Sequence, residues 1–248
     1  VTGVQTCALP ISVRQTLASG DPEGAATGAT ALLDRWSAGP ACGPQAVAEL
    51  EEWQKLLRET MNSLLFNPSV AWRSRTYQVA SGDNLATICA GILKRDAVRI
   101  EPGFLAAVNR VPVDKIKAGK RLRVPIGTMK VVVEKSSFTL KLFLDDVLIR
   151  IYRVGLGKGG CTPSALFKVK LKQAKPVWYP PGGQPVPHGH PNNPLGDHFI
   201  ALESPQHQGF GIHGTRAEDR PTIGTLSSEG CIRMYAEDVA ELFAFLPV

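Results

Sequence analysis

The sequence predicts an α+β chain with three successive parts. A helical segment over residues 12–75 is indicated by apolar residues that recur every three or four positions. A compact βααβ unit over 76–125 is indicated by short alternating runs that flank two helical runs. A mainly-β region over 129–248, which closes with a helix, is indicated by β-branched and apolar runs separated by turns. The chain is 44% hydrophobic and 20% charged, which fits a globular protein rather than a disordered one.

The first eleven residues are not expected to belong to the natural protein. Residues 1–11, VTGVQTCALPI, look like the translation of a common sequencing-adapter oligonucleotide, so the true start of the chain is expected to be missing. A lipoprotein signal ending at Cys7 is the alternative, but neither a basic segment nor an apolar core precedes that cysteine.

The helical segment is predicted to contain two helices, over residues 25–36 and 45–65, with two Gly-Pro pairs between them. The second helix is amphipathic, and its apolar stripe consists of Val47, Leu50, Trp53, Leu57, Met61 and Leu64. A structural spacer is the default role for this segment.

The βααβ unit is predicted to begin with a strand at residues 77–79. A turn then leads into the first helix, with Asp83 as the expected N-cap. A second helix is expected over 104–109, and the returning strand lies within 116–125.

The region from residue 129 onward is dominated by strand-forming residues. Strands are expected over residues 130–134, 139–144, 147–154 and 167–171. Asp145-Asp146 is a two-residue hairpin turn between the second and third of these strands. A helix over 236–246 closes the chain.

A histidine followed by a cysteine is the most informative feature of this region. Fourteen residues separate His213, in the run Gly-Ile-His-Gly-Thr, from the run Ser-Glu-Gly-Cys-Ile-Arg that contains Cys231. A cysteine attacks a carbonyl as its thiolate, so it needs a nearby base or positive charge to lower its pKa. An imidazole meets that need. The alternative is a buried cysteine that only packs, together with a core histidine whose hydrogen bonds are satisfied.

The neighbours of the cysteine fit the same chemistry. Gly230 allows a tight backbone turn, which would leave the sulfur of Cys231 exposed and nearby amide N–H groups free to stabilise an oxyanion. Arg233 offers a planar fork of donors that suits a carbonyl or a carboxylate.

Together the two runs resemble the signature of the L,D-transpeptidase family, the YkuD-type catalytic domain. The likeness extends over residues 129–248 through Val-Gly-x-Gly, Thr-Pro, Pro-x-Trp and Asn-Pro-Leu-Gly runs. Two residues depart from the family pattern, Glu229 in place of His or Asn and Ala165 in place of Gly. Family members usually continue past the last helix, so the end at Val248 is expected to be a truncation. Papain-like and NlpC-type peptidases place the cysteine before the histidine, and the Thr-Leu-x-Thr-Cys context of sortases is missing.

The resemblance implies a β-sandwich-like catalytic domain and a cysteine acyltransferase that acts on peptidoglycan stem peptides. The Cys231 thiolate would attack the carbonyl before D-alanine, His213 would move the proton, and a second stem would resolve the thioester into a 3→3 cross-link. Water as the acceptor would make an L,D-carboxypeptidase, and a non-catalytic wall-binding protein is a third possibility. No cofactor is implied, and carbapenems are expected to acylate Cys231. The implied catalytic residues are Cys231, His213, Arg233, Ser228, Gly230 and Gly214, and the implied substrate-binding residues are Thr215, Trp178, Asn193 and Gly196.

Residues 76–125 resemble a LysM domain through the runs Tyr-x-Val-x-x-Gly-Asp-x-Leu-x-x-Ile, Leu-x-x-x-Asn and Ile-x-x-Gly-x-x-Leu-x-Val-Pro. LysM modules bind glycans that contain N-acetylglucosamine, so the resemblance implies a shallow groove between a turn and a loop. Its implied glycan-binding residues are Gly82, Asp83, Asn84, Leu85, Val111 and Ile116. The alternative is a degenerate domain that only packs against its neighbour.

Charge and hydropathy limit the possible partners. The net charge of +6 suits anionic cell-wall polymers, and the sequence has no known nucleic-acid motif. No uncharged apolar stretch approaches the roughly eighteen residues that would span a membrane. The family resemblance implies an exported bacterial protein, periplasmic or attached to the wall, and a monomer is expected.

The remaining cysteines and histidines are the candidates for a disulfide or a metal site. An exported chain would allow a disulfide between Cys42 and Cys89, which the sequence alone does not establish. No metal is expected, because no acidic or cysteine ligand accompanies the histidines at a recognisable interval. These histidines are His188, His190, His198 and His207.

Overall fold

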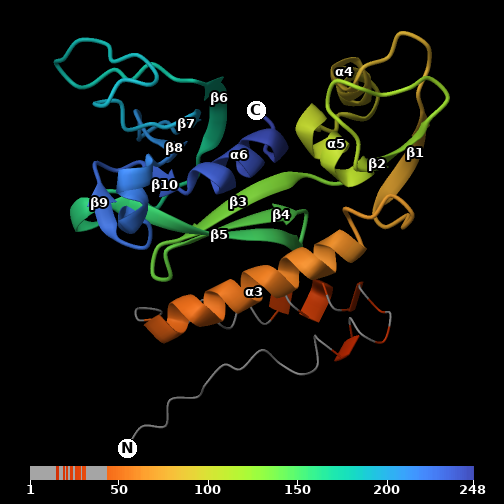
Figure 1. Cartoon of the computed structure of the whole chain (residues 1–248), viewed down its shortest axis with the longest axis horizontal. Coiled ribbons are helices and arrows are strands. Elements are labelled where there is room, and N and C mark those ends of the chain that lie inside the picture. Colours follow the sequence, from red (N-terminus) through yellow and green to blue (C-terminus); the bar gives the residue numbers. More distant parts are fainter. Residues whose placement is uncertain are drawn as a thin grey trace, which may run out of the picture. The chain divides into compact units, whose positions relative to one another are not determined.

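The structure is a computed structural model that describes residues 44–248 and, before them, residues 15, 16, 19, 21, 23, 24, 26–28, 30 and 31. It has two compact units. The first consists of the described residues up to Ser137 together with Lys141–Ile151, and the second consists of Phe138–Leu140 and Tyr152–Val248. Figure 1 labels the helices and strands.

Helix α3, Pro44–Ser63, is the long helix of the first unit. Five residues of the apolar stripe are buried, namely Leu50, Trp53, Leu57, Met61 and Leu64, while Val47 is half-buried. The side-chain amide of Gln54 donates a hydrogen bond to the Ile151 carbonyl at 3.2 Å. The helix expected over 25–36 lies partly outside the described residues. Within that range, residues 26–28, 30 and 31 are described, and they are helical.

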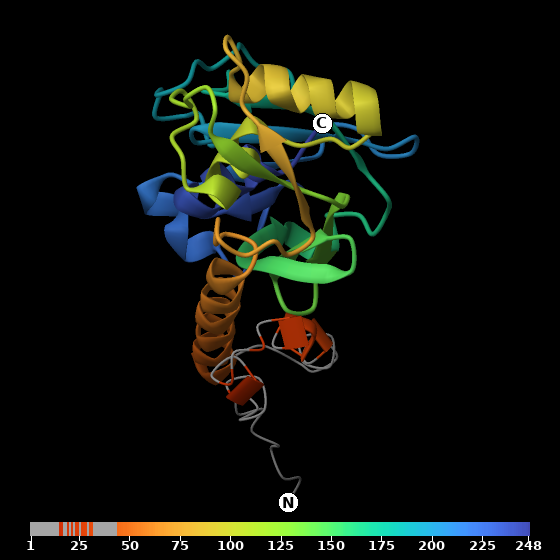
Figure 2. The same ribbon diagram turned by 90° about the vertical axis from the view of Figure 1, so that its right-hand side faces the viewer.

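Residues 74–125 form a strand, two helices and a returning strand. β1 (Ser74–Gln78) pairs antiparallel with β2 (Arg121–Pro125), and α4 (Leu85–Asp96) and α5 (Pro102–Asn109) lie between them in the sequence. Figure 1 and Figure 2 show both helices beside this two-stranded ladder. Their shared core consists of Val79, Leu85, Ile88, Cys89, Ile92, Leu105, Ala106, Leu122 and Val124.

The N-cap of α4 is Asn84, so the expectation of Asp83 at that position is wrong. The Asn84 side chain accepts the backbone N–H of Thr87 at 2.9 Å, and the Thr87 hydroxyl accepts the backbone N–H of Asn84 at 3.0 Å. Asp83 instead accepts the Tyr77 hydroxyl and the Ala80 backbone N–H, both at 2.8 Å. It therefore braces the turn before the helix, while the reciprocal Asn84–Thr87 box satisfies the first helical amides.

Two arginines of the βααβ unit reach the carbonyl groups at the end of α3. The Arg123 guanidinium donates to the carbonyls of Leu64, Leu65, Asn67 and Trp72. The Arg110 guanidinium donates to the Phe66 carbonyl at 2.7 Å and to the Asn62 carbonyl at 3.2 Å. The last carbonyls of a helix have no partner within it, so Arg110 satisfies the Asn62 carbonyl at the end of α3, while Arg123 satisfies carbonyls of the segment that follows the helix.

Eight strands form one mixed sheet in the region after residue 128. The strands are β3 (Met129–Glu134), β4 (Thr139–Leu144), β5 (Val147–Gly157), β6 (Lys168–Ala174), β7 (His198–Glu203), β8 (Gly211–Gly214), β9 (Leu226–Ser228) and β10 (Ile232–Met234). Their order is β3-β4-β5-β10-β8-β7-β6, and β9 pairs with β5 outside that path. The expected sandwich-like domain is thus mainly β, with its strands hydrogen-bonded into a single sheet.

Helix α6, Ala236–Phe245, contacts β7 and β8. Its buried side chains are Val239, Leu242 and Phe245. The Lys172 ammonium group donates to the Phe243 and Leu246 carbonyls at 2.8 and 2.9 Å, which satisfies the C-terminal end of the helix. Among the described residues, no helix is both long enough and apolar enough to cross a membrane.

Candidate active site

The register of the sheet places two of the three main candidate catalytic residues opposite each other, and the third immediately precedes one of the paired strands. β10 runs parallel to β8, and Arg233 lies opposite His213 in their pairing. Residues paired across neighbouring strands point to the same side of a sheet, as do residues two apart along one strand. Cys231 comes immediately before β10, and its thiol lies near the start of β8, close to the Gly209 carbonyl and the Gly211 backbone N–H. Arg233 affects the pKa of both His213 and Cys231, which agrees with this placement.

His213 is held as a neutral base. Its side chain is 4% exposed, and its Nδ1 lies 2.7 Å from the Gly214 carbonyl oxygen. A carbonyl oxygen only accepts hydrogen bonds, so Nδ1 carries the proton and Nε2 keeps its lone pair. Burial, and secondarily the charge of Arg233, lowers the pKa of His213 to about 4. The imidazole is therefore uncharged at neutral pH and able to take a proton at Nε2.

Cys231 is half-buried, with its sulfur 3.8 Å from the Gly209 carbonyl oxygen. Burial raises the pKa of its thiol, and the Gly211 backbone N–H and the Arg233 charge oppose that effect without overcoming it. The expectation that the surroundings lower this pKa is wrong for the resting protein, because desolvation exceeds both favourable contacts. The Cys231 thiol and the His213 imidazole are therefore both uncharged at neutral pH.

The turn before Cys231 is held by Ser228, which is 1% exposed. Its hydroxyl donates to the Cys231 carbonyl at 2.6 Å and accepts the Gly230 backbone N–H at 3.1 Å. Ser228 thus occupies the Gly230 amide, so any free amide N–H for an oxyanion must come from another residue near Cys231. Gly230 has a φ of +125°, and a Cβ there would lie 2.8 Å from the Phe210 ring, so only glycine fits.

Thr162, which belongs to the Thr-Pro run of the family resemblance but was not among the candidate site residues, ties this turn to the end of β5. Its hydroxyl donates to the Gly230 carbonyl at 2.9 Å and accepts the Gly157 backbone N–H at 2.8 Å. A Cβ on Gly157 would overlap the Cys161 sulfur and lie 2.9 Å from the Gly230 Cα. The exposed Cys161 thiol therefore lies beside the turn before Cys231. This proximity depends on the fold and could not be inferred from the order of the residues.

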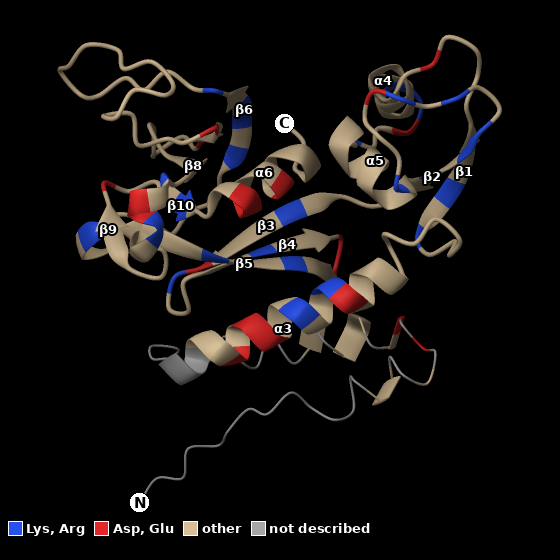
Figure 3. Cartoon of the chain, in the orientation of Figure 1, with Lys and Arg blue, Asp and Glu red and all other residues tan. Residues whose placement is uncertain are grey.

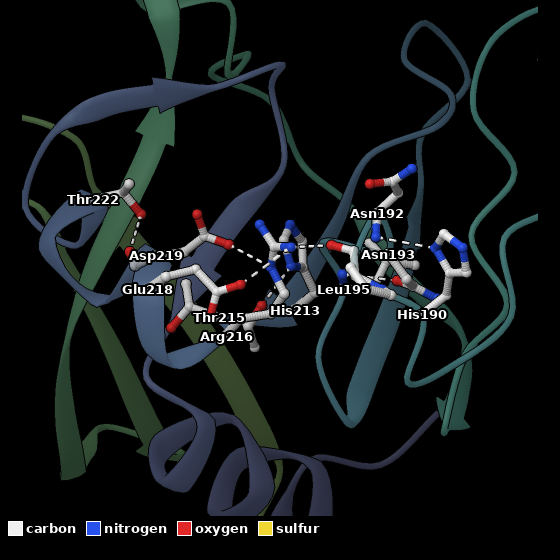
Figure 4. Close-up of polar contacts among 12 residues, drawn as sticks. His190, Asn192, Asn193, Leu195, His213, Thr215, Arg216, Glu218, Asp219 and Thr222 are labelled. Carbon is white, nitrogen blue, oxygen red and sulfur yellow. Dashed lines mark hydrogen bonds and ion pairs between the residues drawn. The ribbon is translucent and has the colours of Figure 1, made fainter.

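The loop between β6 and β7 carries three of the implied substrate-binding residues. Asn193 is 4% exposed, and its side-chain amide donates to the Pro176 and Val186 carbonyls at 3.0 and 3.1 Å. Trp178 forms a backbone bridge with Val186. Gly196 approaches Gly214 so closely that an added Cβ would lie 3.2 Å from the Gly214 carbonyl carbon. Figure 4 shows Asn193 and Leu195 on the loop that comes toward His213.

Thr215, an implied substrate-binding residue, and Glu229, a departure from the family pattern, both contact other side chains or backbone groups of the chain. The buried Thr215 hydroxyl donates to the Met234 carbonyl at 3.1 Å, so it links the ends of β8 and β10. Glu229 points to solvent and pairs with the Lys158 ammonium group at 2.9 Å. Both partners are well exposed, so this ion pair contributes little to stability.

The implied glycan-binding residues lie in the βααβ unit. Leu85 is 1% exposed and belongs to the core, whereas Asp83 and Asn84 are committed to the turn and the helix cap described above. Gly82 is exposed with a φ of +88°, and nothing lies within 4 Å of an added Cβ. Val111 and Ile116 are partly buried against the core of the unit.

The remaining histidines and cysteines concern possible metal and disulfide sites. Residues 44–248 and the described residues before them contain no group of three or more His, Cys, Asp or Glu side chains arranged to hold a metal ion. His188 Nε2 lies 2.7 Å from an Asp197 carboxylate oxygen. Cys89 is a free, buried thiol, and burial raises its pKa to about 12. Its proposed partner Cys42 lies outside the described residues.

The shifted pKa of His213 predicts how the stability of the fold depends on pH. The unfolded chain binds a proton at His213 below its ordinary pKa of about 6.5, while the folded chain binds it only near 4. The free energy of unfolding should therefore fall as the pH drops from about 6.5 to about 4. Urea titrations across this range would measure the slope. His213→Gln should flatten it, and the exposed His190→Gln is the control; an unchanged slope in His213→Gln would contradict the prediction.

The fold and the site define a transpeptidase domain with a cysteine and a histidine at its centre. A family model for the YkuD-type L,D-transpeptidase catalytic domain matches residues 128–248. YqjB of Bacillus subtilis, whose name assigns it to the L,D-transpeptidases, is 34% identical over 125 residues that cover 49% of this chain and 68% of YqjB. YkuD of the same organism is 31% identical over 179 residues, which cover 69% of this chain and 93% of YkuD.

The chain belongs to the L,D-transpeptidase family. Among solved structures it is similar to L,D-transpeptidase 3 from Mycobacterium tuberculosis, which was determined with a faropenem-derived adduct. The identity is 18%, the TM-score is 0.41, and the match covers 53% of this chain and 63% of the mycobacterial one. The chain thus spans a little under two thirds of that structure.

Proposed function

We propose that this protein is a peptidoglycan transpeptidase that forms 3→3 cross-links through a thioester on Cys231. The observation that supports the proposal is the pairing of β10 with β8, in which Arg233 lies opposite His213 while Cys231 immediately precedes β10. Membership of the L,D-transpeptidase family supports the same reaction. The proposed place of action is the bacterial cell wall, outside the cytoplasmic membrane.

The first half-reaction begins with proton transfer from the Cys231 thiol to Nε2 of His213. The thiolate attacks the carbonyl between the third stem residue and the terminal D-alanine, and the carbonyl carbon becomes tetrahedral. Arg233 is the proposed partner of the oxygen that gains charge, because it lies opposite His213 and its guanidinium offers two directed donors. The carbon–nitrogen bond then breaks, and the His213 imidazolium returns the proton to the departing D-alanine amine.

The second half-reaction transfers the acyl group. The side-chain amine of a second stem attacks the thioester, its proton passes to His213, and the carbon–sulfur bond breaks. The Cys231 thiolate leaves and is reprotonated, so the resting neutral pair is restored. The deep burial of His213 lowers its pKa, so the imidazole is unprotonated at the start of each half-reaction and its Nε2 can accept the proton.

The function is tested by incubating the protein with purified disaccharide-tetrapeptide and analysing the products by mass spectrometry. A dimer that has lost one D-alanine supports transpeptidation. Disaccharide-tripeptide without dimer would replace the proposal with L,D-carboxypeptidase activity, in which water takes the place of the acceptor amine. Unchanged substrate at high enzyme concentration would contradict both and would favour a non-catalytic wall-binding protein.

We further propose that residues 76–125 form a LysM module that holds the protein on wall glycans. This segment contains nine Lys and Arg residues against four Asp and Glu, so it carries most of the net charge of +6. Figure 3 shows basic residues along β1 and β2 and in the neighbouring loops. Val113, in the loop of the proposed groove, is 54% exposed, which offers an apolar contact for a sugar ring.

The LysM proposal predicts that Val113→Asp weakens binding of the full chain to purified sacculi severalfold, because a charged side chain would replace the apolar contact. The matched control is Ile126→Asp, which places the same charge at a similarly exposed residue (49%) just after β2. Pull-down at low ionic strength, where the basic residues are least screened, measures the bound fraction. Equal binding by both variants and the parent chain would contradict the proposed groove.

A further inference from the structure

Arg216 forms a polar clamp close to the catalytic histidine. It follows Thr215 at the end of β8, three residues after His213. Its Nε donates to an Asp219 carboxylate oxygen at 2.8 Å, and its Nη1 lies 3.3 Å from a Glu218 carboxylate oxygen. The same Nη1 donates to the Pro191 carbonyl on the loop between β6 and β7. Figure 4 shows these contacts beside the His213 ring.

The two carboxylates fix the direction of the guanidinium. Asp219 belongs to the short 3-10 helix Ala217–Thr222, and the Thr222 hydroxyl donates to the Asp219 carbonyl at 2.6 Å. The Arg216 side chain is about two-thirds buried, so its position is restricted by packing as well as by charge. The prong that reaches Pro191 is therefore already oriented, and charge-assisted hydrogen bonds of this kind are stronger than neutral ones.

The loop that Arg216 contacts, residues 176–196, contains no Lys, Arg, Asp or Glu. The His188 ring lies 2.7 Å from the carboxylate of Asp197 next to the loop, and the Arg216 guanidinium supplies a charged contact from another part of the chain. Asn193 organises the base of the loop through its bonds to Pro176 and Val186. Pro191 lies two residues before Asn193, on the part that the Arg216 prong meets. Because the acceptor at 191 is a backbone carbonyl, the contact constrains the path of the chain itself.

We propose that Arg216 is a positioning residue that ties the 176–196 loop to the segment after β8 and thereby sets the affinity for the stem peptide. The reasoning rests on the proposed function, since the loop also brings Gly196 against Gly214 beside the catalytic histidine. Arg216 acts through the loop and takes no part in bond making or breaking. Its loss should therefore change substrate binding and leave the chemical step nearly intact.

Two variants and one matched control test this role. Arg216→Gln removes the charge and the fork, and Arg216→Lys keeps the charge with a single donor group. The control is Arg220→Gln, which lies on the same 3-10 helix and pairs with Glu237 at 2.8 Å, away from the loop. Hydrogen exchange measured by mass spectrometry reports the loop directly, and steady-state kinetics on disaccharide-tetrapeptide separates KM from kcat.

Arg216→Gln is expected to speed deuterium uptake in peptides covering 176–196 and to raise KM about tenfold, with kcat changed less than about twofold. Arg216→Lys should fall between it and the parent chain, and Arg220→Gln should match the parent chain in both measurements. Unchanged uptake in Arg216→Gln, equal changes in Arg220→Gln, or a fall in kcat at constant KM would each overturn the proposal. If the parent chain does not act on the substrate, the proposed function fails, and the hydrogen-exchange comparison still decides whether Arg216 holds the loop.

Discussion

Cys231→Ser and Cys231→Ala are expected to reduce turnover of disaccharide-tetrapeptide below detection while the fold is preserved. Alanine removes the nucleophile. Serine keeps the shape, but its hydroxyl has a far higher pKa than a thiol, and burial at this position already opposes ionisation of the cysteine. His213 is a weak base with a pKa of about 4, so it cannot generate an alkoxide in useful amounts. Mass-spectrometric turnover assays and thermal unfolding of the same samples would measure both effects.

The same cysteine is expected to be the single site that carbapenems acylate. Intact-mass measurement should show one adduct per chain, and peptide mapping should place it on Cys231. Cys161→Ser is the matched control, because Cys161 is an exposed thiol beside the same turn. An adduct on Cys161 in the parent chain, or substantial turnover by both Cys231 variants, would show that Cys231 is not the nucleophile.

His213→Ala is expected to slow acylation by a carbapenem by about two to four orders of magnitude at neutral pH, the usual contribution of a general base. Burial raises the pKa of the Cys231 thiol, so without the imidazole very little thiolate forms. Raising the pH should restore part of the rate, because hydroxide then removes the proton. Since the thiol pKa is raised, the recovery should begin above the range where an ordinary cysteine ionises.

Arg233→Lys distinguishes the role of the base from that of the arginine. Lysine keeps the positive charge but loses the planar fork, so acylation should be impaired at every pH without recovery in alkali. Stopped-flow or quenched mass-spectrometric rates from about pH 6 to pH 10 would separate the two profiles. Acylation of His213→Ala at the parent rate at neutral pH would contradict the assignment of His213 as the base.

The catalytic runs could be found from the sequence because their function depends on local backbone geometry. Gly230 must adopt a positive φ under Phe210, and Ser228 must close the turn around it, so these residue types appear at fixed spacing from Cys231. The pairing of His213 with Arg233 was not predicted, because it joins two short strands that are distant in the sequence. The predicted bounds of the strand at 139–144 agree with the structure, since its run of mostly apolar residues is followed by the Asp145-Asp146 turn.

Features that depend on distant partners could not be predicted. The direction of the Cys231 pKa shift is set by burial under other parts of the fold, which the residues beside the cysteine do not encode. The hydroxyl of Thr162 reaches Gly230 from 68 positions away, and Arg216 meets the Pro191 carbonyl 25 positions away. The cap of α4 was missed for a local reason, because Asp83 and Asn84 are both good capping residues and only the Thr87 contact selects between them.

The arginine contacts at the end of α3 have a consequence for how the first unit folds. Arg123 reaches the Leu64 carbonyl across 59 positions, and Arg110 reaches Asn62 across 48. The final turn of the helix and the turn after it gain these partners only after β2 and α5 are in place, so the entropy cost of closing these long loops comes before the contacts contribute. The helix end and the βααβ unit should therefore melt as one cooperative block. A cut between residues 65 and 76 would separate partners that stabilise each other, whereas a fragment that begins at Pro44 would retain them.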